Sequence, residues 1–123
     1  MEKLYYNLYK DIVVAKSIQE DTFKRFLFST ISNTILVFYL ASKQKATLEE
    51  LCYNIPPKVI SRSTIQNILK EGTKILFFKK EINLNDKRAK YYKLSEQGKD
   101  ILNGWALNLR NNFNEVLNRL KVA

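Results

Sequence analysis

Pro56 and Pro57, the only prolines in the chain, divide a helical pattern into two short pieces. Proline lacks a backbone donor and disfavours helical backbone in the residue before it, so a helix approaching this pair ends by about residue 55. That helix begins at Leu48, because the segment from Thr47 to Glu50 is a capping box. Beyond the prolines, Ser61 can cap a second helix that runs to about residue 74. We therefore expect a helix-turn-helix pair.

The second helix of this pair has one apolar side and one polar side. Ile65, Ile68 and Leu69 recur at helical spacing on the apolar side. The polar side carries Arg62, Ser63, Gln66, Asn67 and Lys70. Such side chains suit the edges of DNA bases, since arginine pairs with guanine, asparagine and glutamine pair with adenine, and serine pairs with either. An ordinary amphipathic surface helix has the same pattern, so this helix alone does not decide its role.

Two β-rich runs follow the second helix. Residues 75–82 form the first run, residues 83–86 are turn-like, and residues 87–94 return as a second strand. A hairpin placed directly after a helix-turn-helix is the wing of a winged helix. The tip of a wing can enter the minor groove, where the negative potential of a narrow groove favours arginine. Arg88 is the candidate for that contact.

Basic residues are concentrated in this part of the chain. The formal net charge of the whole chain is +9. Residues 58–93 contain ten basic side chains against Glu71, Glu81 and Asp86, a net charge of +7 over 36 residues. A local field of that kind attracts polyanions, of which DNA is the most common. A solvated surface on a lysine-rich chain is the alternative interpretation of the same charge.

Helical patterns flank this region on both sides. An apolar stripe predicts a helix over residues 2–20, and residues 22–43 are apolar on several sides, as expected of one central helix. Ser95 caps a final helix, residues 95–121. The two terminal helices offer more apolar face than a small core can cover, so we expect them to form a dimer interface. Its expected residues are Leu4, Leu8, Ile12, Trp105, Leu109, Phe113, Val116, Leu117 and Leu120. A monomer whose two ends fold together is the alternative.

Composition excludes several classes of protein. The chain has no histidine, so it lacks the imidazole that Ser-His-Asp and Cys-His catalysis and His-ligated zinc sites need. We therefore expect no enzyme activity, no metal and no other cofactor.

The single cysteine, Cys52, fits a small core residue in a reducing environment. Residues 1–19 mix polar and apolar side chains, so we expect no secretory signal. The most apolar stretch, residues 26–41, is shorter than the roughly 20 residues of a membrane span. We expect a cytoplasmic protein.

Two short motifs resemble those of the MarR-type winged helix-turn-helix regulators, a family of small dimeric transcription regulators. Asp86-Lys87-Arg88 resembles the D-x-R of that family's wing tip, and Leu94-Ser95-Glu96-Gln97-Gly98 resembles the L-[TS]-x-x-G that begins its last helix. The resemblance implies that Arg88 enters the minor groove while Asp86 holds its guanidinium by a charge-assisted contact. The family usually has a glycine between recognition helix and wing, whereas here Gly72 lies earlier, within the expected helix.

These observations together predict a mainly α chain with a small β-hairpin wing, in the α+β class. Residues 1–123 would form a single winged-helix domain, with helix-turn-helix and wing at 47–94 and dimerisation helices at 2–20 and 95–121. The expected function is a homodimeric, sequence-specific, double-stranded DNA-binding transcription regulator that reads a pseudo-palindromic site. The expected DNA contacts are Ser61, Arg62, Ser63, Thr64, Gln66, Asn67, Lys70, Lys79, Lys80, Asp86, Lys87, Arg88 and Lys90. A winged-helix protein-interaction adaptor, or a plasmid or phage replication-type DNA binder, is the alternative, and the sequence marks no site for a small-molecule effector.

Overall fold

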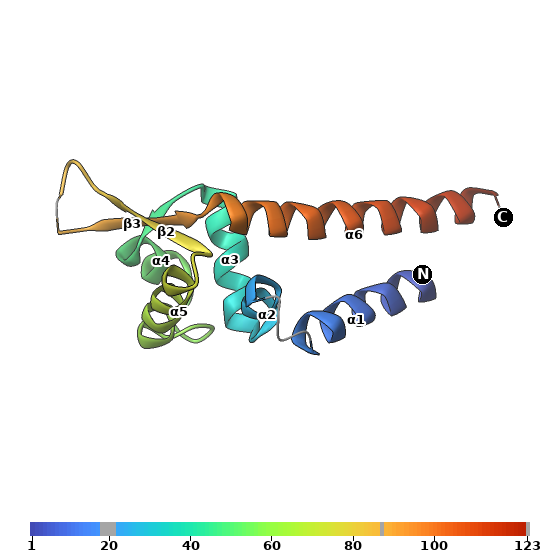
Figure 1. The fold of residues 1–123 in the computed structure, drawn as a ribbon, viewed down its shortest axis with the longest axis horizontal. Coiled ribbons are helices and arrows are strands. Elements are labelled where there is room, and N and C mark those ends of the chain that lie inside the picture. The colour runs from blue at the N-terminus through green and yellow to red at the C-terminus, as the bar shows by residue number, and fades with distance from the viewer. Residues whose placement is uncertain (18–21, 87, 123) are drawn as a thin grey trace.

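The computed structural model describes every residue of the chain except 18–21, 87 and 123. Its elements, in chain order, are α1 (Glu2–Ser17), α2 (Thr22–Phe28), α3 (Ile31–Lys43), β1 (Ala46–Thr47), α4 (Leu48–Asn54), α5 (Arg62–Lys74), β2 (Phe78–Ile82), β3 (Lys90–Leu94) and α6 (Glu96–Val122). The chain is therefore mainly helical with a small antiparallel sheet, an α+β arrangement. The β2-β3 hairpin projects at one end of the molecule, and α1 and α6 extend toward the other (Figure 1).

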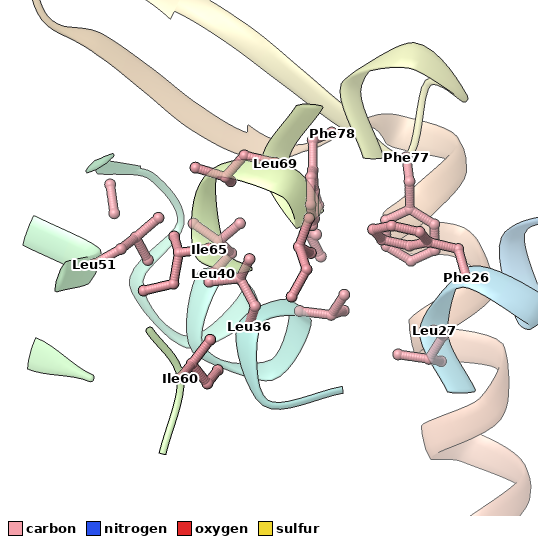
Figure 2. Packing of buried hydrophobic residues seen from close by; sticks show 14 of the residues in the cluster. Phe26, Leu27, Leu36, Leu40, Leu51, Ile60, Ile65, Leu69, Phe77 and Phe78 are labelled. Carbon is pink, nitrogen blue, oxygen red and sulfur yellow. The ribbon is translucent and has the colours of Figure 1, made fainter. Parts of the chain in front are cut away.

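The hydrophobic core lies where α3, α4, α5 and the base of the sheet meet. Leu36 and Leu40 from α3 pack with Leu51 of α4 and Ile65 of α5, and each is fully buried (Figure 2). A cluster of aromatic side chains continues this core toward α2. The centre of the Phe26 ring lies 5.1 Å from the centre of the Phe77 ring and 5.4 Å from that of the Phe78 ring. The helix-turn-helix pair and the hairpin are thus attached to one packed centre.

The prediction of a single helix over residues 22–43 is wrong, because α2 and α3 are separate helices bent by 102°. Thr30 is the N-cap of α3, and its hydroxyl oxygen accepts a hydrogen bond from the Asn33 amide at 3.1 Å. The buried Asn33 side chain donates to the carbonyl of Phe26 at 3.0 Å, and the Thr34 hydroxyl donates to the carbonyl of Leu27 at 2.6 Å. Polar side chains within an apolar run therefore satisfy the carbonyls at the end of α2 and the amides at the start of α3.

The described part of the chain contains no single helix that is both long and apolar enough to cross a membrane. Among the helices of the described residues, α2 and α3 reach that length and apolarity when they are taken together across their bend.

The junction between α5 and the hairpin is a Schellman motif. The amide of Phe77 donates to the carbonyl of Gly72 at 2.8 Å, and the amide of Leu76 donates to the carbonyl of Thr73 at 3.2 Å. Leu76 has φ 67°, the left-handed conformation that glycine usually supplies at this position. This cap occupies residues 75–77, so the first strand begins at Phe78 and not at residue 75 as the sequence predicted.

Two predicted helix N-caps are confirmed, but between the described residues Thr47 and Glu50 the structure has only the first half of the capping box, without a hydrogen bond from the Thr47 amide to the Glu50 side chain. The Thr47 hydroxyl accepts the amide of Glu50 at 3.1 Å at the start of α4. The Ser95 hydroxyl accepts the amide of Gly98 at 3.0 Å at the start of α6, and it also donates to the carbonyl of Leu76 at 2.6 Å. Ser95 therefore begins the last helix and ties it to the junction that follows α5.

The two terminal helices lie side by side within one chain (Figure 1). Leu4 of α1 and Val116 of α6 are each 5% exposed. The ammonium of Lys3 lies 2.8 Å from the carboxylate of Glu115, and this contact lowers the pKa of Glu115 below its ordinary value. Part of the apolar stripe on each helix is thus covered by the other helix of the same chain.

Candidate nucleic-acid interface

The polar side of α5 faces solvent, as the sequence predicted. The apolar residues Ile65, Ile68 and Leu69 are buried against the core, whereas all five polar residues expected opposite them are exposed. The Ser61 hydroxyl caps the helix by accepting the amide of Thr64 at 3.3 Å. Ser61 also shares hydrogen bonds with the hydroxyls of Ser63 and Thr64, at 3.2 and 2.9 Å. Three hydroxyl groups therefore gather at the N-terminus of α5, where backbone amides and the helix dipole favour a phosphate.

Arg62, the first residue of α5, is paired with Glu49 of α4. Its two terminal nitrogens donate to the two carboxylate oxygens at 3.1 and 2.5 Å. The hydrogen bond from Arg62 lowers the pKa of Glu49 below its ordinary value, and the same contact raises the pKa of Arg62. Sequence reasoning missed Glu49, because the pair joins positions 13 residues apart that meet only when α4 and α5 take their final angle. The bidentate geometry holds the guanidinium at the edge of the polar side of α5.

The β2-β3 hairpin has two different faces, which follow from its antiparallel register. Residues directly opposite each other share a face, and successive residues alternate between faces. One face begins in the core with Phe78 and Leu94 and continues through Lys80 and Tyr92 to Ile82 and Lys90. We call it the inner face, because the ring of Phe78 lies against Gly72 of α5. The outer face carries Lys79 with Lys93 and Glu81 with Tyr91.

The outer face neutralises part of its own charge. The carboxylate of Glu81 lies 2.5 Å from the ammonium of Lys93 and 3.9 Å from that of Lys45. The hydrogen bond from Lys93 lowers the pKa of Glu81 below its ordinary value. The ammonium of Lys45 also lies 4.5 Å from the centre of the Tyr91 ring. Lys79, expected from the sequence to contact DNA together with Lys80, lies on this face and makes no ion pair with any carboxylate that the structure describes.

The inner face keeps its cations unneutralised. Lys80 and Lys90 make no ion pair with any carboxylate that the structure describes. The ammonium of Lys80 lies 6.0 Å from the centre of the Tyr92 ring, at the outer limit of a cation-π contact. These two lysines therefore carry net positive charge on the side of the hairpin that faces α5.

The hairpin tip differs from what the family resemblance implied. The carboxylate of Asp86 accepts the backbone amide of Arg88 at 3.0 Å, and the structure has no ion pair between these two side chains, both of which it describes. Asp86 therefore shapes the turn through the backbone of Arg88, which is exposed. Lys87, also expected to contact DNA, lies outside the described residues.

The residues expected at a dimer interface divide into three groups. Leu4 and Val116 are buried within the chain, between α1 and α6. Leu8, Trp105, Leu109 and Leu117 are half-buried, and Trp105 packs inside the chain with its ring 5.6 Å from that of Phe28 and 5.8 Å from that of Phe38. Ile12, Phe113 and Leu120 remain 41–58% exposed. The single chain thus leaves part of the expected apolar surface uncovered.

The terminal helices also border a hollow of about 600 Å³ between α1, α2 and α6. Its floor includes Leu27, Phe28 and Trp105, and its rim is largely asparagine, lysine and aspartate.

The described residues contain no group of three or more histidine, cysteine or acidic side chains that could hold a metal ion. No protein-family model, characterised protein or solved structure matches this chain.

Proposed function

We propose that the chain is a winged helix-turn-helix protein that binds double-stranded DNA as a homodimer and regulates transcription. In this proposal α5 is the recognition helix in the major groove, and the β2-β3 hairpin is the wing that reaches the adjacent minor groove. The helical flanks hold two copies together, and the chain performs no catalysis of its own.

The observation that carries the proposal is the fixed placement of α5 against the inner face of the hairpin. Phe78 joins the two elements, since it is buried against Gly72 of α5 and begins the face that carries Lys80 and Lys90. The polar residues of α5 and the unneutralised lysines of the hairpin therefore belong to two elements that contact each other (Figure 1). A double helix offers a polyanion that touches both elements at once.

Within this interface the contacts take different roles. Gln66 and Asn67 suit base edges, whereas the hydroxyls at the start of α5 suit a phosphate. Lys80 and Lys90 suit phosphates, and Arg88 suits the minor groove. Arg62 is held by Glu49, so its contact is restricted to a base or phosphate that its guanidinium reaches from that position.

A second copy of the chain would cover the exposed apolar surface of the terminal helices. Tyr5, Tyr9, Ile12 and Val13 recur at helical spacing on α1 and are each 42–63% exposed. Phe113 and Leu120 on α6 are 41% and 58% exposed. Apolar side chains gathered on two neighbouring helices are typical of a surface that another protein covers, and a two-fold dimer is the most common arrangement.

The proposal is tested by fluorescence anisotropy of the purified protein against a pool of random duplex DNA at two salt concentrations, with sequencing of the bound fraction. We expect binding that weakens with salt and enriches a palindrome, and a dimer in sedimentation. Arg88→Ala should weaken binding to every sequence and lower the salt slope by about one unit. Arg110→Ala is the matched control, because it removes the same charge from an exposed position on α6. The proposal is wrong if the wild-type protein fails to bind duplex DNA at low salt.

A further inference from the structure

The tip of the hairpin exposes two large aliphatic side chains. Leu84 is 91% exposed, and Ile82, at the end of β2, is 63% exposed. Hairpin tips are usually built from small and polar residues, because an exposed aliphatic side chain gains nothing from water. The apolar side chains of the tip therefore contribute little to the folding of the single chain.

Hydrogen bonds form between described residues of the turn on either side of the exposed Leu84. The side-chain carbonyl of Asn83 accepts the amides of Asn85 at 3.0 Å and Asp86 at 3.4 Å. The backbone carbonyl of Asp86 accepts the amide of Ala89 at 3.1 Å. Polar groups on both sides of Leu84 are thus used within the turn, and the leucine contributes no buried surface to it.

Positive charge surrounds these aliphatic side chains. Ile82 lies directly opposite Lys90 and follows Lys80 on the inner face, while Arg88 lies exposed in the same loop. A lipid surface or an acidic protein would also accept apolar and basic groups together. The base of the hairpin packs on α5 through Phe78, however, so a large partner that binds α5 is also the expected partner of the tip.

We propose that the tip is an apolar wedge in which Leu84, supported by Ile82, inserts from the minor groove between two base pairs and bends the duplex. This inference rests on the proposed DNA-binding function. Wedges of aliphatic residues partly unstack a base step and kink the duplex by about 20–90° toward the major groove. Pyrimidine-purine steps unstack most easily, so the wedge is expected at such a step beside the contact of Arg88.

The test measures the bend directly, by energy transfer between dyes at the two ends of a duplex of about 30 base pairs that contains TA steps. A second duplex carries 2-aminopurine at those steps, so that its fluorescence rises when a base loses its stacking neighbour. Wild-type protein should shorten the end-to-end distance and raise the 2-aminopurine signal. Leu84→Ala should abolish both changes while affinity falls by no more than about tenfold, because the phosphate contacts remain. Leu107→Ala, an exposed leucine of α6, is the matched control and should behave as wild type.

The outcomes separate this inference from the function on which it rests. If wild-type protein binds no duplex, the proposed function is wrong and the wedge with it. If Leu84→Ala binds and bends the duplex as wild type does, the wedge alone is wrong. If Leu84→Ala leaves the bend intact but changes the association state in sedimentation, the tip is a protein-contact surface and the wedge is again overturned.

Discussion

Substitution of Gly72 by alanine tests how closely α5 and the hairpin are packed. A Cβ atom at this position would lie 2.3 and 2.5 Å from two carbons of the Phe78 ring and 2.8 Å from the ring of Phe26. Both rings are buried, at 1% and 3% exposure, and their centres are 5.4 Å apart. Neither ring can move without displacing its neighbours, so the added methyl group forces α5 and β2 apart.

The expected change in the free energy of unfolding for Gly72→Ala is the difference between two opposing contributions. In an open helix, replacing glycine by alanine stabilises a protein by about 1 kcal/mol, because the unfolded chain loses freedom. Inserting a methyl group into a close-packed core costs about 1–3 kcal/mol, and contacts this short place Gly72 at the upper end. We therefore expect Gly72→Ala to lower the free energy of unfolding by about 2 kcal/mol.

Gly104 supplies the matched control, because it also lies inside a helix but a Cβ there would meet nothing within 4 Å. Gly104→Ala should raise the free energy of unfolding by about 0.5–1 kcal/mol. Urea unfolding followed by far-ultraviolet circular dichroism measures both values, with the slope m checked for constancy. A Gly72→Ala variant as stable as wild type, or more stable, would refute the close approach of α5 to β2 and with it the proposed placement of the wing.

Three further predictions concern the interface and the core. Glu49→Gln should increase the affinity for random duplex DNA more than Glu50→Gln does in a salt titration, since both remove one negative charge from α4 but only the first frees the arginine that it holds on α5. The pKa of Glu81 is lowered in the folded chain, chiefly by its hydrogen bond from Lys93. This pair therefore stabilises the fold at pH values above the pKa of glutamate in the unfolded chain, and the stabilisation disappears as the pH falls through the lowered pKa. Glu81→Gln should accordingly flatten the dependence of the urea midpoint on pH in acid. Trp105→Ala should lower the free energy of unfolding, measured with urea, by about 2 kcal/mol. This is less than the cost of removing a fully buried tryptophan, because Trp105 is half-buried. A change in the association state would be seen separately, by sedimentation.

The short helices and their caps could be predicted from the sequence because their causes are local. The hydroxyls of Thr47 and Ser61 each accept a hydrogen bond from the backbone amide three residues further on. Pro56 prevents α4 from continuing. The hairpin was also predictable in outline, since its two strands are separated by turn-forming residues. Its first strand was predicted three residues too early, because Leu76 adopts a left-handed conformation that leucine rarely takes.

The break between α2 and α3 could not be predicted from periodicity. Residues 22–43 suit a continuous helix in composition, and serine or threonine at its centre would be tolerated there. The bend is stabilised by contacts with distant parts of the chain, since it brings Phe26 against Phe77, about fifty positions later. The Glu49 and Arg62 pair has the same origin, because it depends on the angle between two helices and not on either helix alone.

Fewer basic side chains of the candidate interface are free of ion pairs than the sequence suggests. The sequence gives residues 58–93 a net charge of +7, and every lysine in that segment counts equally. In the structure Glu49, from outside the segment, neutralises Arg62, and Glu81 neutralises Lys93 on the outer face. Among the described residues, positive charge without an ion pair consequently remains on Lys70 and Lys74 of α5, and on Lys79, Lys80, Arg88 and Lys90 of the hairpin. The carboxylates of Glu49 and Glu81 therefore lower the positive charge at two separate places, the first turn of α5 and the outer face of the hairpin, because each forms an ion pair there.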